Sequence, residues 1–156
     1  MIILGLVSIV LDLIILNVSP YTINNITSLF PMLTFVYIIS MFYFSKKVDI
    51  TYYVIIFLYL LIGNNIFLPL MGLILLHYLI TKYKAYFKIN IFSYLFLVTL
   101  SIAIFDIFTF FILVLFNSLQ FNIYYLSYKI TNSIILNISY GILLYFLFPV
   151  LISNKN

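Results

Sequence analysis

Apolar residues fill long, nearly unbroken runs along this chain, and short polar gaps separate the runs. The six apolar runs cover residues 2–18, 29–44, 51–63, 67–81, 91–116 and 128–152. A helix needs about 20 residues, at about 1.5 Å each, to cross the hydrocarbon of a membrane. The first two and the last two runs reach that length with interfacial residues added, whereas the third and fourth reach only about 20 Å. The pattern predicts an all-α fold, a single integral membrane domain over residues 1–156 with six transmembrane helices, or five.

The third and fourth runs are divided by the stretch "IGNNIFLPLMG", which holds two adjacent amides and a proline. We expect a short hairpin over residues 51–81 whose tip lies within the outer leaflet. Lipid cannot satisfy the backbone there, so the hairpin should pack inside the bundle. Asn64 and Asn65 can supply hydrogen bonds, and Pro69 can open a helix without losing one. The alternative is an ordinary outer loop between two longer spans.

Composition supports lipid as the surrounding solvent. Of 156 residues, 67% are hydrophobic and only 6% are charged, too few charges to cover a soluble core. Cysteine is absent, which excludes disulfides, thiolate metal sites and cysteine nucleophiles. The net charge of +4 comes from scattered lysines that form no stripe, so no nucleic-acid partner is expected. The first run has neither a positive flank before it nor a cleavage site after it, and we expect it to stay in the protein as a helix.

The lysines predict the orientation of the chain. If the N-terminus is cytoplasmic and every run crosses, six of the seven lysines lie on the cytoplasmic side, at positions 46, 47, 82, 84, 88 and 155. This distribution follows the positive-inside rule. A re-entrant hairpin at residues 51–81 would give the same result, because it also returns the chain to its starting side. We therefore expect a multi-pass protein of the cell membrane with both termini in the cytoplasm.

Signatures of catalysis are absent from the sequence. It contains no phosphate-binding glycine loop, no zinc-protease or serine-hydrolase motif and no cluster of carboxylates. His77 is the single histidine, and a packed side chain is the favoured interpretation, because a metal needs further ligands that the sequence does not offer. We expect no enzymatic activity, no cofactor and no metal.

Three charged residues interrupt the apolar runs, namely Asp12, Asp106 and Lys129. An ionisable group inside a membrane helix normally faces the bundle interior and has a partner. The favoured interpretation is a static polar contact that fixes helix register, and the alternative is a contact point for another membrane protein or a small polar ligand. We expect Lys129 to pair with Asp12, Asp106 or both in the outer half of the bundle. Asp12 is the favoured partner because it lies nearer the outer end of its run.

Three stretches resemble the family of the rod shape-determining protein MreD: "LDLIILNVSPY", "SLFPMLTFVYIISMFYF" and "IGNNIFLPLMGLILLHYLITKYK". Typical members have a proline that opens the second helix, where this chain has Pro31. They also have a glycine with an acidic residue before a short glycine turn, where this chain has Gly63, Asn64 and Gly72. Asparagine replaces the acid here.

The resemblance implies a non-enzymatic scaffold in the bacterial machinery for cell elongation and peptidoglycan synthesis. The implied partners are an MreC-like protein and other membrane proteins of that complex. The family's fold is similar to the substrate-binding membrane subunits of energy-coupling-factor transporters, so the alternative function is a vitamin-type transporter subunit. Such subunits dock through small residues on the first helix, where this chain has only Gly5 and Ser8, and they need a pocket with convergent polar groups.

Overall fold

The computed structural model describes residues 2–18, 32–44, 50–62, 74, 77–78, 81–82, 90–116 and 120–153. Five helices make up most of this part of the chain: α1 (Ile2–Val18), α2 (Leu33–Phe44), α3 (Ile50–Ile62), α5 (Ile91–Leu115) and α6 (Ile123–Ser153). The all-α prediction is confirmed. Asn64 and Asn65, at the tip of the predicted hairpin, lie outside the described residues.

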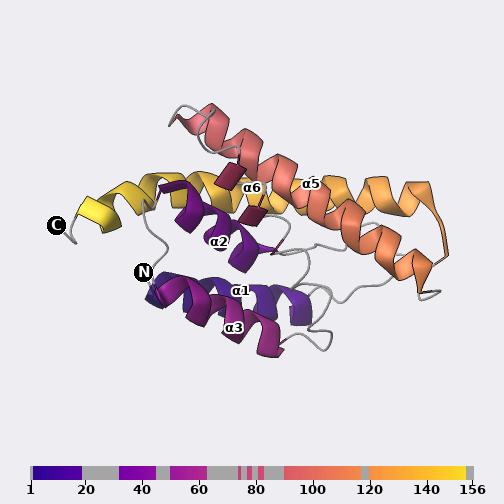
Figure 1. The fold of residues 1–156 in the computed structure, drawn as a ribbon, viewed down its shortest axis with the longest axis horizontal. Coiled ribbons are helices and arrows are strands. Elements are labelled where there is room, and N and C mark those ends of the chain that lie inside the picture. The colour runs from indigo at the N-terminus through magenta and orange to yellow at the C-terminus, as the bar shows by residue number, and fades with distance from the viewer. Residues whose placement is uncertain are drawn as a thin grey trace.

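The helices pack around α2, which contacts α1, α3, α5 and α6. In Figure 1, α1 and α3 lie side by side below α2, while α6 runs along its upper side and α5 crosses α6 obliquely. The first residues of α1, α3 and α5 lie toward one end of the bundle, together with the last residues of α2 and α6. Helices α1 and α2 are therefore antiparallel, as are α5 and α6.

Helix α2 is the enclosed element of the fold. From Met32 to Tyr43 no side chain is more than 7% exposed. The 12 residues of α2 extend only about 18 Å, because the helix begins later than the apolar run 29–44 suggested. The hairpin expected over residues 51–81 was predicted to be enclosed, but its first helix, α3, is not. Ile55 is fully buried, whereas Phe57 is 61% exposed, so α3 lies on the outside of α2.

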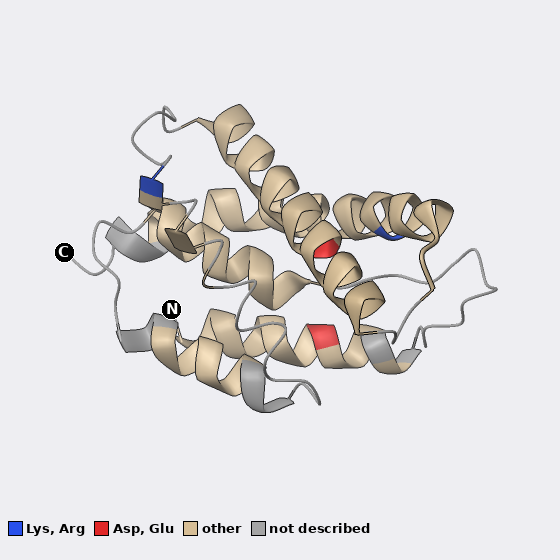
Figure 2. Cartoon of the chain, turned by 45° about the vertical axis from the view of Figure 1, so that its right-hand side comes forward, with Lys and Arg blue, Asp and Glu red and all other residues tan. Residues whose placement is uncertain are grey.

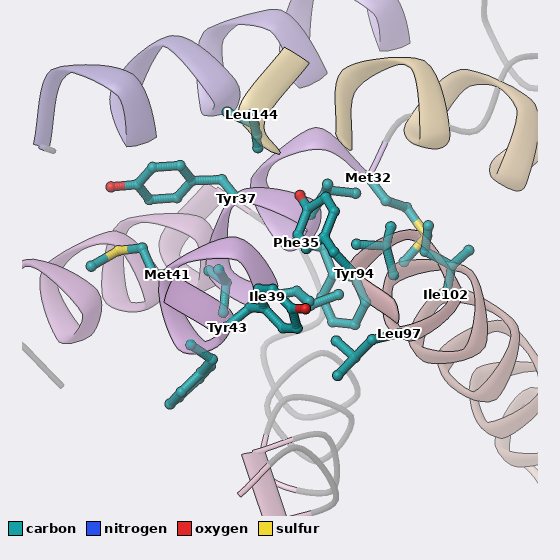
Figure 3. Packing of buried hydrophobic residues seen from close by; sticks show 14 of the residues in the cluster. Met32, Phe35, Tyr37, Ile39, Met41, Tyr43, Tyr94, Leu97, Ile102 and Leu144 are labelled. Atoms are coloured by element: carbon teal, nitrogen blue, oxygen red, sulfur yellow. The ribbon is translucent and has the colours of Figure 1, made fainter. Parts of the chain in front are cut away.

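Aromatic and branched side chains of α2 fill the space between the helices (Figure 3). The ring of Phe35 packs against Phe105 of α5 with centroids 4.9 Å apart, and Tyr37 packs against Phe148 of α6 at 5.6 Å. Such tilted pairs contribute about 0.5–1.5 kcal/mol beyond the burial of their area. They fix the height of α2 relative to α5 and α6.

Asparagine caps determine where the two long helices begin. The side chain of Asn90 accepts a hydrogen bond from Ser93 N (2.7 Å) at the start of α5. Asn122 accepts from Tyr124 N and Tyr125 N (3.0 and 3.1 Å) at the start of α6. Asparagine is a preferred capping residue because its oxygen satisfies amides that have no partner within the helix. Helix α6 therefore begins at Ile123, five residues before the run 128–152 that the apolar pattern outlined.

The described surface is largely apolar, and buried positions include many polar side chains. Exposed residues include Ile3 (78%) and Phe92 (81%). The buried polar residues are Ser8, Asp12, Thr34, Ser40, Ser101, Asp106, Thr109, Ser133 and Asn137. Helix α5 and residues Ile123–Val150 of α6 are long and apolar enough to cross a membrane, by length and composition. These features suggest a membrane protein.

Candidate functional site: buried polar contacts around helix α2

The amino-terminal end of α2 lies inside the bundle and is capped by side chains from two other helices. The Met32 amide donates to Oδ1 of Asn137 on α6 (2.8 Å). The Leu33 and Thr34 amides donate to Oδ1 and Oδ2 of Asp12 on α1 (2.8 and 2.9 Å). The first amides of a helix have no partner within it, and in lipid they find no water. Asp12 and Asn137 therefore let α2 begin in the middle of the bundle.

The carboxyl group of Asp12 is well suited to this cap. Its residue is only 5% exposed, and both of its oxygens accept an amide hydrogen, as an ionised carboxylate does. The amino end of a helix carries about half a positive elementary charge, which compensates a nearby anion. In Figure 2 the acidic residues of the described helices lie within the body of the bundle, on α1 and α5.

Helices α5 and α6 are joined by an ion pair. Lys129 Nζ lies 3.1 Å from Asp106 Oδ1, and the two side chains are 19% and 1% exposed. Of the two partners considered for Lys129, the structure selects Asp106, and the preference for Asp12 is wrong. The preference assumed that Lys129 stands at the outer start of its helix. Because α6 begins at Ile123, Lys129 lies almost two turns inside it, close to the depth of Asp106.

Two hydroxyl pairs add further cross-links. The hydroxyl groups of Ser8 on α1 and Tyr140 on α6 lie 2.6 Å apart, as do those of Ser40 on α2 and Tyr94 on α5. The side chains of Ser8 and Ser40 also donate to carbonyl groups four residues earlier in their own helices. Since lipid tails are as apolar as the core, packing and interhelical hydrogen bonds of this kind hold membrane helices together.

Gly5 marks the closest approach between α1 and its neighbours. A Cβ atom at this position would lie 2.6 Å from Ile55 Cδ1 of α3 and 2.9 Å from the ring of Tyr37 of α2. Only glycine fits without a shift of these side chains. Ser8, the other small residue of α1, contacts Tyr140 of α6. Both small residues therefore face helices of the same chain.

His77 lies beside α2 and packs edge to face against Phe42, with ring centroids 4.8 Å apart. Its carbonyl group accepts a hydrogen bond from Thr81 Oγ1 (2.8 Å), which is typical of a helical turn. Among the described residues, no three His, Asp or Glu side chains come together in a way that could hold a metal ion.

The structure brings together residues that the sequence analysis named and others that it did not. Asp106 and Lys129 form one contact, and Asp12 forms a separate one. Asn137 and Tyr140 were not singled out. A signal for Asn137 exists in the spacing of Lys129, Ser133 and Asn137, which places three polar side chains on one face of α6. The polar contacts make cross-links between helices.

Comparisons of this chain with protein-family models, with curated proteins and with solved structures give no match.

Proposed function

We propose that this protein is a multi-pass membrane helix bundle that acts as a non-enzymatic scaffold in the bacterial cell-elongation complex. The proposed membrane location is supported by an inverted distribution of polar and apolar side chains. Side chains such as Asp12, Asp106 and Asn137 are buried and bonded to other helices, while large apolar side chains cover the outside. A fold of this kind is stable when lipid surrounds it, and in water its exposed apolar surface would aggregate.

The orientation proposed is the one with both termini in the cytoplasm. It is supported by the lysine distribution and by the direction of the helices. The start of α3 and the start of α5 lie toward the same end of the bundle as the end of α6 (Figure 1). In the sequence, the lysine-rich stretches at 46–47 and 82–88 precede α3 and α5.

The role in cell elongation is supported by the resemblance of the three sequence stretches to MreD. It is also supported by the buried charged side chains, which bind groups of the same chain. Asp12 engages both carboxyl oxygens with α2, and Asp106 engages Lys129, so these charged groups act within the chain. Their arrangement favours a rigid body that partners recognise from outside. An MreC-like protein and other membrane proteins of the elongation complex are the partners proposed.

One observation weighs against the transporter alternative. Docking of a substrate-binding subunit would use small residues on the lipid-facing side of α1. Gly5 and Ser8 instead face α3, α2 and α6 of the same chain.

Photo-crosslinking in living cells tests the proposed function. A photoreactive residue is placed at exposed positions, namely Val10, Phe57, Phe96 and Ile135, and at buried Ile9 as the matched control. We expect at least one exposed position to capture a membrane component of the elongation complex, identified by mass spectrometry, while Ile9 captures none. Capture of an energising transporter subunit, together with co-purification of a small molecule, would replace the scaffold by the transporter alternative. If neither is captured at any exposed position, the scaffold proposal is wrong.

A further inference from the structure

One buried oxygen atom of α5 and one of α6 have no hydrogen-bond partner among the described residues. They are Oδ2 of Asp106 and Oγ of Ser133, in residues that are 1% and 0% exposed. The other oxygen of Asp106 is bound to Lys129. Buried polar atoms are almost always bonded, so each of these two atoms indicates a partner outside the chain's own hydrogen bonds.

The two atoms lie at nearly the same depth in the bundle. Asp106 is about 14 Å from the end of α5 at Leu115, and Ser133 is about 15 Å from the start of α6 at Ile123. Those two helix ends lie together at one end of the molecule (Figure 1). Ser133 is also one turn from Lys129, so it lies on the same face of α6 as the lysine that binds Asp106.

Several hydroxyl groups of the described helices are satisfied within their own helix. Ser40, Thr131 and Ser139 each donate to the carbonyl group four residues earlier. Such a bond satisfies a hydroxyl group inside its own helix. The Ser133 hydroxyl makes no bond of this kind and remains able to donate and accept.

We infer that Asp106 and Ser133 form a binding site for a single water molecule between α5 and α6. The carboxylate oxygen can only accept, so the ligand must donate a hydrogen bond. Lys129 disfavours a second cation and Asp106 disfavours an anion, so the ligand is neutral. A water molecule donates one hydrogen to Asp106 Oδ2 and exchanges a second hydrogen bond with Ser133 Oγ. Buried waters normally bridge otherwise unsatisfied polar groups in this way.

Thermal unfolding of the protein in detergent tests the inference. The decisive quantity is whether Ser133→Ala lowers or raises Tm. Ser133→Ala removes a ligand of the water, and we expect Tm to fall by about 2–6 °C. Ser139→Ala is the matched control on the same helix, because Ser139 is exposed and satisfied by its own carbonyl. It should leave Tm unchanged. If Ser133 held no ligand, alanine would remove a buried unsatisfied group, and Tm would stay the same or rise, which overturns the inference.

X-ray radiolysis with mass spectrometry adds a test on the unaltered protein. Hydroxyl radicals formed from a bound water oxidise neighbouring side chains even when these are buried. Phe110 lies one turn from Asp106 and is 1% exposed, and Phe148 is equally buried elsewhere in the core. We expect Phe110 to be oxidised several-fold faster than Phe148 in the unaltered protein, and Ser133→Ala to remove the difference where it folds. Equal oxidation in the unaltered protein overturns the inference.

Discussion

The strongest prediction concerns Asp12, because its carboxyl group holds the start of the enclosed helix α2. Asp12→Ala removes both acceptors of the Leu33 and Thr34 amides and leaves these two amides buried. Asp12 is only 5% exposed, so the two amides lose their acceptor at a place away from bulk solvent. The variant therefore disturbs the place at which α1 and α2 meet.

The size of the effect follows from two hydrogen bonds. Bonds to a charged group contribute about 1.5–3 kcal/mol each in soluble proteins. Interhelical bonds in membrane proteins average about 0.6 kcal/mol, because the unfolded chain in the membrane also finds partners. A central value for two carboxylate bonds is about 3 kcal/mol, and a change of 1 kcal/mol shifts Tm by about 2–4 °C in a chain of this size. We expect Asp12→Ala to lower Tm by about 6–12 °C.

Thermal unfolding in a mild detergent, followed by loss of helical circular dichroism, measures this shift. Asp12→Asn keeps one carbonyl oxygen for an amide and should lose about half as much as Asp12→Ala. Asn17→Ala, on the exposed side of α1, is the matched control and should leave Tm unchanged. The reasoning is refuted if Asp12→Ala lowers Tm no more than Asn17→Ala does.

Three further predictions test close packing, the ion pair and orientation. Gly5→Ala should lower Tm by several degrees, because its Cβ would lie 2.6 Å from an isoleucine of α3. Gly141→Ala meets ordinary contacts of 3.6 Å or more and should leave Tm unchanged. Equal shifts in Tm for the two variants would contradict this prediction. Asp106→Asn should lower the protein level in membranes, and exchanging the two charges of Asp106 and Lys129 should restore it. If the double variant accumulates no better than the single ones, the ion pair does not contribute to the protein level. A cysteine at Ala85 should resist an impermeant thiol reagent in intact cells, and labelling there would reverse the proposed orientation.

The sequence predicts helices well where the apolar run itself sets the boundary. Helix α1 covers the predicted run 2–18, and α5 ends one residue before the run 91–116 does. Two boundaries were missed because polar atoms set them. Helix α6 begins at a cap made by Asn122, before its apolar run. Helix α2 begins where Asp12 and Asn137 cap it, and these partners come from distant parts of the chain. Hydropathy carries no information on such a long-range cap.

In the candidate site, too, the sequence predicts some features and leaves others to the fold. Asp12, Asp106 and Lys129 stand out in the sequence because a charge in an apolar run is costly without a partner. Which partner each one takes depends on depth, and depth depends on where the helices begin. Asn137 is harder to single out, since one amide within an apolar run is less costly than a charge and reveals its role only when the end of another helix lies beside it.

The pairing of charges explains why α2 is short. The described bundle buries two acids, Asp12 and Asp106, but Lys129 can neutralise only one of them. Asp12 is compensated instead by the amides and the positive end of a helix that begins beside it. If α2 continued for another turn toward its amino end, those amides would bond within the helix and Asp12 would lose its partner. The late start of α2 and the acid in α1 therefore depend on each other, and a change that lengthens α2 is expected to be tolerated only when Asp12 is replaced by an apolar residue.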